Sequence, residues 1–84
     1  MKAIKIYQLA ISNSKNITFT DFTKLLEAFN FRLERINGSH HIYKHITAKE
    51  LINIQNVKGK VKPYQVKQFL SIVESYNLKM DKEK

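Results

Sequence analysis

The chain has 84 residues, and fifteen Lys and Arg against seven Asp and Glu give it a formal charge of +8. A chain of this length forms one small domain with a single core. The positive charge points to a polyanionic partner, with nucleic acid as the leading candidate, although an excess of Lys can also serve solubility alone. Cysteine is absent, which excludes disulfides, thiolate metal sites and cysteine nucleophiles and suits the cytoplasm. No apolar run approaches the ~18 residues of a membrane span, so we expect neither membrane insertion nor export.

Two helices are predicted in the first third of the chain. Residues 3–11 have apolar side chains at helical spacing. The stripe expected to face the core comprises Ile4, Tyr7 and Ile11, widened by Ala3, Ile6 and Ala10. After an aperiodic connector at residues 12–16, Thr18 or Thr20 can cap a second helix. The buried stripe of that helix is expected to be Phe19, Phe22, Leu25, Leu26 and Phe29.

From residue 31 the apolar period changes from 3.6 to two, which predicts a β-hairpin. Its strands span residues 31–36 and 40–46, and Asn37-Gly38-Ser39 supplies the turn after Asn30 ends the helix. Alternation places His41, Tyr43 and His45 on one face of the second strand, and His40, Ile42, Lys44 and Ile46 on the other. Because the isoleucines require a core, we expect the Ile42 face to be interior. His41 is then an exposed imidazole beside the turn.

A third strand is predicted over residues 51–57, where Ile52 and Ile54 share one face. A basic loop, residues 58–62, precedes a closing helix that begins at Pro63, which the first helical turn tolerates. The buried stripe of this helix is expected to be Val66, Phe69, Leu70, Val73 and Tyr76, with Asn77 as its stop. The order predicts an α+β fold, a three-stranded antiparallel sheet with helices on one face, preceded by a short extra N-terminal helix.

Two motifs carry a resemblance to a known family: Arg35-Ile36-Asn37-Gly38-Ser39-His40-His41-Ile42-Tyr43, and Val57-Lys58-Gly59-Lys60-Val61-Lys62-Pro63-Tyr64-Gln65-Val66. In this order the chain resembles the HicA family of toxin–antitoxin ribonucleases, whose core is similar to the double-stranded RNA-binding fold. The resemblance covers about residues 19–78. It divides the chain into an N-terminal helix and connector (1–17), a HicA-like RNA-cleaving domain (18–78) and a charged tail (79–84).

The resemblance implies the toxin of a type II toxin–antitoxin system, a metal-independent endoribonuclease that cleaves mRNA and is neutralised by a HicB-type antitoxin. In the family's Gly-Ser-x-His pattern the catalytic histidine falls on His41, and the small residues before it match Gly38 and Ser39. The sequence departs from the pattern in its extra first helix and in a second histidine, His40, which remains a candidate. We expect the toxin alone to be monomeric.

The chemistry suits histidine, because RNA carries its own nucleophile and cleavage needs a group that takes the 2′-hydroxyl proton. A histidine side chain titrates near pH 6.5, close to the pH of the cytoplasm. Residues expected to contact RNA are Gly38, Ser39, Tyr43, Lys44, Lys58, Lys60, Lys62 and Arg35. The three loop lysines are expected to converge on one phosphate at the start of the closing helix.

No metal or cofactor is expected. A zinc site built from His40, His41 and His45 is disfavoured, because adjacent strand residues diverge and residues four apart lie about 13 Å apart. Two other functions stay open: a non-catalytic RNA-binding module with the same fold, and an inactive toxin whose basic face binds only an acidic partner.

Overall fold

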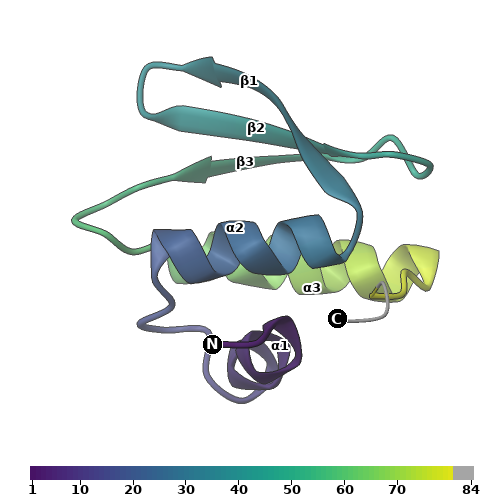
Figure 1. Ribbon diagram of the computed structural model, residues 1–84, viewed down its shortest axis with the longest axis horizontal. Helices are drawn as coiled ribbons and strands as arrows, with labels where there is room; N and C mark the ends of the chain where they lie inside the picture. The colour runs from purple at the N-terminus through teal and green to yellow at the C-terminus, as the bar shows by residue number, and fades with distance from the viewer. Residues whose placement is uncertain (81–84) are drawn as a thin grey trace.

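The computed structural model describes residues 1–80 and has the predicted α+β fold, consistent with the double-stranded RNA-binding fold (Figure 1). The elements are α1 (Ala3–Ser12), α2 (Phe19–Ala28), β1 (Phe31–Asn37), β2 (His40–His45), β3 (Leu51–Gln55) and α3 (Pro63–Tyr76). The strands form one antiparallel sheet in the order β1-β2-β3. Helices α2 and α3 cover one face of it, and α1 lies on their far side. Of the predicted charged tail, residues 81–84 lie outside the described residues.

The core forms where α2 and α3 meet beneath the sheet. Phe69 of α3 packs edge-on against Phe22 and Phe29, with ring centroids 5.5 and 5.2 Å apart. Its ring also lies 6.0 Å from that of Phe31 at the start of β1. The predicted stripe of α2 is therefore confirmed as core, since all its members but the half-buried Phe19 are fully enclosed.

The ends of the helices follow their capping residues. The hydroxyl of Thr18 accepts a hydrogen bond from the backbone of Asp21 at 3.1 Å, which satisfies a free N–H at the start of α2. Asn30 has a φ of 69° and Asn77 a φ of 52°, left-handed conformations that end α2 and α3. Pro63 begins α3 as predicted. No helix in the described part of the chain is both long and apolar enough to span a membrane.

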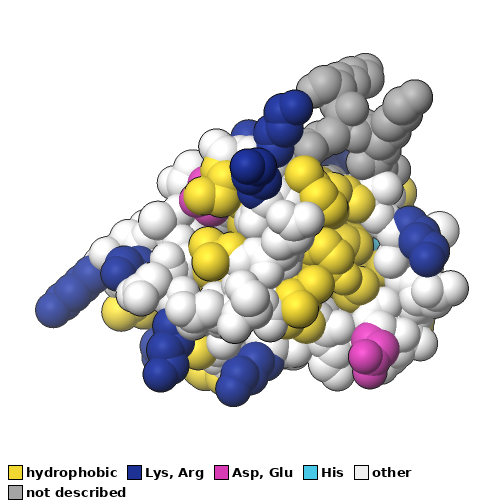
Figure 2. Space-filling view, turned by 90° about the horizontal axis from the view of Figure 1, so that it is seen from below, with side chains coloured by type: hydrophobic (Ala, Val, Ile, Leu, Met, Phe, Trp, Pro, Cys, Tyr) yellow, Lys and Arg dark blue, Asp and Glu magenta, His cyan; other side chains and the backbone are white. Residues whose placement is uncertain are grey.

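Helix α1 has the predicted extent but turns a different face to the core. The buried residues are Ala3, Ile6 and Ala10, whereas Ile4 is 42% exposed and Ile11 is 60% exposed. The alanines allow the α1 backbone to approach α2 closely, and Tyr7 reaches the ring of Phe29 at 5.1 Å. Figure 2 views the molecule from the α1 side, where hydrophobic side chains are exposed at the centre and Lys and Arg surround them.

The predicted orientation of β2 is wrong. Tyr43 is 5% exposed and His45 is 4% exposed, both on the helix-covered face, whereas Ile46 is 51% exposed. The register pairs Tyr43 with Ile52, and both Ile52 and the next inward residue of β3, Ile54, are fully buried. His45 tolerates burial because its Nδ1 accepts hydrogen bonds from the backbone N–H groups of Thr47 and Ala48. Local hydrogen bonds thus allow polar rings to take the interior face.

Tyr76 also departs from its predicted place. The apolar pattern predicts it in the buried stripe of α3, but the side chain is exposed and its hydroxyl donates to the Glu50 carboxylate at 2.9 Å. Ile72 is buried instead, beside Val73. The buried face of α3 is therefore slightly offset from the predicted stripe, although Val66 and Phe69 lie in the core as predicted.

Candidate functional site

The hairpin turn between β1 and β2 consists of Gly38 and Ser39, flanked by the paired residues Asn37 and His40. Gly38 has a φ of 63°, whereas the φ of Ser39 is not positive. This combination is typical of a type II′ turn with glycine at its first central position. A Cβ at Gly38 would meet nothing within 4 Å. Glycine is therefore required by the backbone conformation rather than by crowding, and the surface beside the turn is open.

His41 begins the helix-covered face of β2. Its half-buried ring packs edge-on against Phe19, with centroids 4.8 Å apart and an interplanar angle of 67°. The ring Nδ1 lies 3.4 Å from the carbonyl oxygen of Ser39. A carbonyl oxygen can only accept, so Nδ1 carries the proton in this contact. When the ring is neutral, Nε2 has the lone pair that a proton acceptor requires.

Phe19 links His41 to the basic loop. The backbone N–H of Phe19 donates to the carbonyl of Gly59 at 2.9 Å, and Thr18 forms a β-bridge with Lys60. Three segments far apart in the sequence therefore meet at one end of the molecule, on the left in Figure 1: the hairpin turn, the start of α2, and residues 57–62. We call this end the turn cluster.

The basic loop is itself a tight turn. Val57 and Lys60 exchange two backbone hydrogen bonds, of 2.8 and 3.1 Å. The residues between them, Lys58 and Gly59, have φ values of 53° and 84°, and two positive φ values in a row are typical of a type I′ turn. The predicted strand over residues 51–57 accordingly ends at Gln55.

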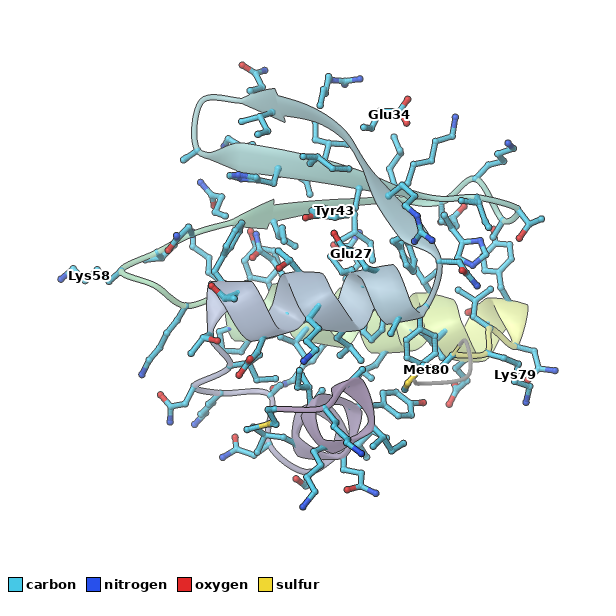
Figure 3. The ribbon with its side chains drawn as sticks, in the orientation of Figure 1. Glu27, Glu34, Tyr43, Lys58, Lys79 and Met80 are labelled. Atoms are coloured by element: carbon cyan, nitrogen blue, oxygen red, sulfur yellow. The ribbon has the colours of Figure 1, made fainter. Side chains whose placement is uncertain are left out.

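The three loop lysines have separate surroundings in the structure, and their convergence on one phosphate stays a prediction. Lys58 occupies the tip of the turn and extends away from the body of the protein (Figure 3). The Nζ of Lys60 donates to the side chain of Asn16 at 2.9 Å, and the Nζ of Lys62 lies 6.0 Å from the centroid of the Tyr64 ring. These ammonium groups form a spread of positive charge around the turn cluster. Their contact with phosphate remains a prediction.

Gln65 holds the strand and helix ends of the turn cluster together, and sequence reasoning missed it. The side chain is 2% exposed, and its Oε1 accepts from the backbone N–H of Gln55 at 3.4 Å and of Lys62 at 3.3 Å. A glutamine three residues after a helix N-cap is one half of a capping box, which was the available signal. It fixes the start of α3 against the end of β3.

His40 lies on the opposite, open face of β2. Its Nδ1 is 3.0 Å from Oδ1 of Asn53, and its Nε2 is 3.4 Å from Nε2 of Gln55. The sequence did not predict a role for Asn53 or Gln55, because polar residues at alternate positions of a strand are typical of an ordinary solvent-facing side. The two adjacent histidines therefore occupy different surroundings and face in different directions.

The other predicted RNA contacts are divided between the two faces. Tyr43 is buried beneath the sheet, so its prediction as an RNA contact is wrong. Burial, and secondly the charge of Glu27, raises the pKa of the Tyr43 hydroxyl (Figure 3). A β-bulge leaves Glu34 without a partner in β2, since Leu33 pairs with Tyr43 but Arg35 with Ile42. The bulge moves Arg35 to the open face, which Lys44 also shares.

No group of three or more His, Cys, Asp or Glu that could hold a metal ion occurs within residues 1–80. His45 directs Nδ1 to the Thr47–Ala48 turn and packs against Phe31 at the end of β2 opposite His40 and His41. The donor groups of the turn cluster are instead imidazole and ammonium groups, which suit proton transfer and anion binding.

The chain is a small, basic α+β domain consistent with the double-stranded RNA-binding fold, and a histidine lies beside the glycine turn at one end of its sheet. A family model described as the HicA toxin of bacterial toxin–antitoxin matches residues 19–74, more than half of the chain. The chain therefore belongs to the HicA toxin family, and α1 lies outside the matched region. Comparison with curated proteins and with solved structures gave no match.

Proposed function

We propose that this HicA-family toxin is a metal-independent endoribonuclease that cleaves mRNA in the cytoplasm, with His41 as the general base. The observation that carries the proposal is the place of His41 in a chain of this family: it lies at the turn cluster, where a glycine turn, the start of α2 and a basic turn meet. The contacts with the Phe19 ring and the Ser39 carbonyl hold the His41 ring beside the turn.

The proposed reaction uses the ring nitrogen of His41 that does not contact Ser39. With Nδ1–H directed at the Ser39 carbonyl, Nε2 can accept the proton of a ribose 2′-hydroxyl. The 2′-oxygen then forms a bond to the adjacent phosphorus and the bond to the 5′-oxygen breaks, which yields a 2′,3′-cyclic phosphate and a 5′-hydroxyl. General base catalysis of this kind contributes roughly 10²- to 10⁴-fold.

The cations around the turn cluster supply the second requirement, stabilisation of the extra negative charge that develops on the phosphate. Lys58 and Lys60 flank Gly59, whose carbonyl holds the start of α2 against which His41 packs. We therefore assign phosphate binding to this turn. His40 lies on the opposite face of the sheet from His41, so we give it no part in proton transfer from the same hydroxyl.

Neutralisation by a HicB-type antitoxin is part of the proposal. Membership in a toxin–antitoxin family implies an antitoxin partner. A partner that covered the turn cluster with acidic side chains would compete with RNA for the same positive charge.

The test is incubation of the purified protein with a structured RNA in the presence of EDTA, followed by analysis of the product ends. We expect cleavage to persist and the products to carry 2′,3′-cyclic phosphates, because attack by the internal 2′-hydroxyl requires no metal. Products with 3′-hydroxyl ends, or cleavage abolished by EDTA, would refute the mechanism.

One observation favours the alternative of RNA binding without cleavage. The His41 ring packs against Phe19, so it could serve the core instead of the reaction. The same assay separates the two functions, since a binding module would retain the RNA and leave it intact.

A further inference from the structure

Polar side chains from all three strands lie in register on the open face of the sheet, beside the hairpin turn. Asn37 pairs with His40, and His40 pairs with Gln55, so one residue of each strand forms a row across the sheet. The next row is Arg35, Ile42 and Asn53. No helix packs on this face (Figure 1), so its amide and imidazole side chains do not serve as hydrogen-bond partners for groups buried under a helix.

His40 fixes the orientation of two amide side chains. Its Nδ1–H donates to Oδ1 of Asn53 at 3.0 Å, and its Nε2 accepts from Nε2 of Gln55 at 3.4 Å. The Gln55 amide nitrogen also lies 3.5 Å from the hydroxyl of Ser39 in the turn. The amides are therefore held in place before any ligand arrives, which lowers the entropy lost on binding.

This network leaves a complementary pair of polar groups free. Within the described residues, the side-chain N–H₂ of Asn53 and the side-chain carbonyl oxygen of Gln55 make no hydrogen bond. The two residues are two positions apart on β3, with Cα atoms about 7 Å apart, and face the same way, so a donor and an acceptor lie side by side on the open face. Nucleobases present donors and acceptors along their edges, and unpaired bases expose those edges fully.

We propose that His40, Asn53 and Gln55 form a subsite that binds one unpaired nucleobase of the RNA and sets the base preference of cleavage. Ile42 provides an apolar floor next to Asn53, and Arg35 in the same row binds the phosphate of that nucleotide. The inference rests on the proposed function for its choice of RNA as the ligand.

The position of the subsite relative to His41 suits this role. His40 and His41 are consecutive residues at the start of β2 that face opposite sides of the sheet. A single strand that crosses the hairpin turn can place one base on the open face and the adjoining ribose beside His41. The base bound there is therefore a neighbour of the cleaved linkage, where a preference would be read in the products.

The test measures binding of octamers of A, C or U whose riboses are 2′-O-methylated, so that the probes lack the nucleophile and cannot be cleaved. We expect the wild-type protein to bind one octamer at least about fivefold more tightly than another, the lower range for amide recognition of a base. The Asn53→Ala/Gln55→Ala variant should bind all of them within about twofold, since its remaining contacts are to phosphate.

Asn53→Asp is the second variant, because it keeps the oxygen that His40 binds and replaces only the free N–H₂ by an acceptor. It should weaken all octamers through its charge and also change their ranking. Gln8→Ala, an exposed amide on α1, is the control and should keep the wild-type ranking.

Equal binding of the octamers by the wild-type protein, or an unchanged ranking in both Asn53 variants, overturns the inference. The proposed function is tested separately on unmodified RNA. Lost base preference in a protein that never cleaves RNA would leave the subsite standing and end the nuclease proposal. Normal RNA cleavage by a protein whose variants keep the wild-type ranking would leave the nuclease proposal standing and rule out the subsite.

Discussion

Tyr43 is the residue whose ionisation is most clearly tied to the fold. Burial, and then the nearby charge of Glu27, raises the pKa of its hydroxyl above 10.0. A raised pKa stabilises the folded protein at every pH below the unfolded value, and this contribution is lost as the pH rises through the folded pKa.

Replacing Tyr43 by Phe should therefore flatten the alkaline decline in stability. Urea unfolding between pH 8 and pH 12 should show the free energy of unfolding of the wild-type protein falling more steeply above about pH 10 than that of Tyr43→Phe. Tyr64→Phe, a change at an exposed tyrosine, is the control. If the free energy of unfolding fell equally with pH in the wild type and in Tyr43→Phe, the Tyr43 hydroxyl would have the same pKa in the folded and unfolded protein.

At this scale the sequence predicted the hairpin turn but not the faces to which the side chains of the following strand point. The Gly38-Ser39 turn and the strand after it follow from residue types alone. The orientation of β2 did not follow, because isoleucine is the better core residue by transfer free energy. What reversed it was the pair of N–H groups at Thr47 and Ala48 that satisfy His45, a local geometry that alternation does not encode.

The basic turn is the element whose charge is proposed to hold RNA. Changing Lys58, Lys60 and Lys62 together to Ala should lower the slope of log affinity against log salt by about two units, at about 0.7 per phosphate contact for single strands. The measurement is RNA affinity at several salt concentrations, with His41→Ala protein to prevent cleavage.

The matched control is Lys2→Ala/Lys5→Ala/Lys67→Ala, which removes the same charge from exposed positions outside the turn cluster. It should change the slope much less, because those lysines lie on α1, its N-terminal flank and the outer face of α3. Equal slopes in the two triple variants would mean that overall charge, rather than the basic turn, binds the RNA.

Element boundaries were predictable wherever a single residue type determined them. Thr18, Asn30, Pro63 and Asn77 each begin or end a helix through a known backbone or capping requirement. The turn at Lys58 and Gly59 ends β3 earlier than predicted, because two positive φ values in a row interrupt a strand. Lysine rarely adopts a φ of 53°, so its presence at position 58 does not predict a turn.

At the scale of the whole molecule, α1 lies outside the family match yet completes the core. Ile6 is fully buried against the helices, while Ile11 on the same helix is mostly exposed. The apolar pattern of α1 supports either stripe, and only the close approach allowed by Ala3 and Ala10 selects one. That selection is a tertiary effect, so the sequence could not supply it.

Truncating each isoleucine tests whether α1 is an integral layer. Ile6→Ala should lower the free energy of unfolding by about 2–5 kcal/mol, as expected for a buried side chain whose loss leaves a cavity. Ile11→Ala should change it by less than about 0.5 kcal/mol. Similar small effects in urea unfolding would mean that α1 is a loosely attached extension.

The claim that His41 removes the 2′-hydroxyl proton is tested most directly by the cleavage rates of His41→Ala and His40→Ala on one RNA. Thermal melts of both proteins check that they are folded, since His41 also packs against Phe19. We expect His41→Ala to cleave roughly 10²- to 10⁴-fold more slowly than the wild type, and His40→Ala to retain cleavage. A folded His41→Ala protein that cleaves at the wild-type rate, with His40→Ala inactive, would contradict the assignment.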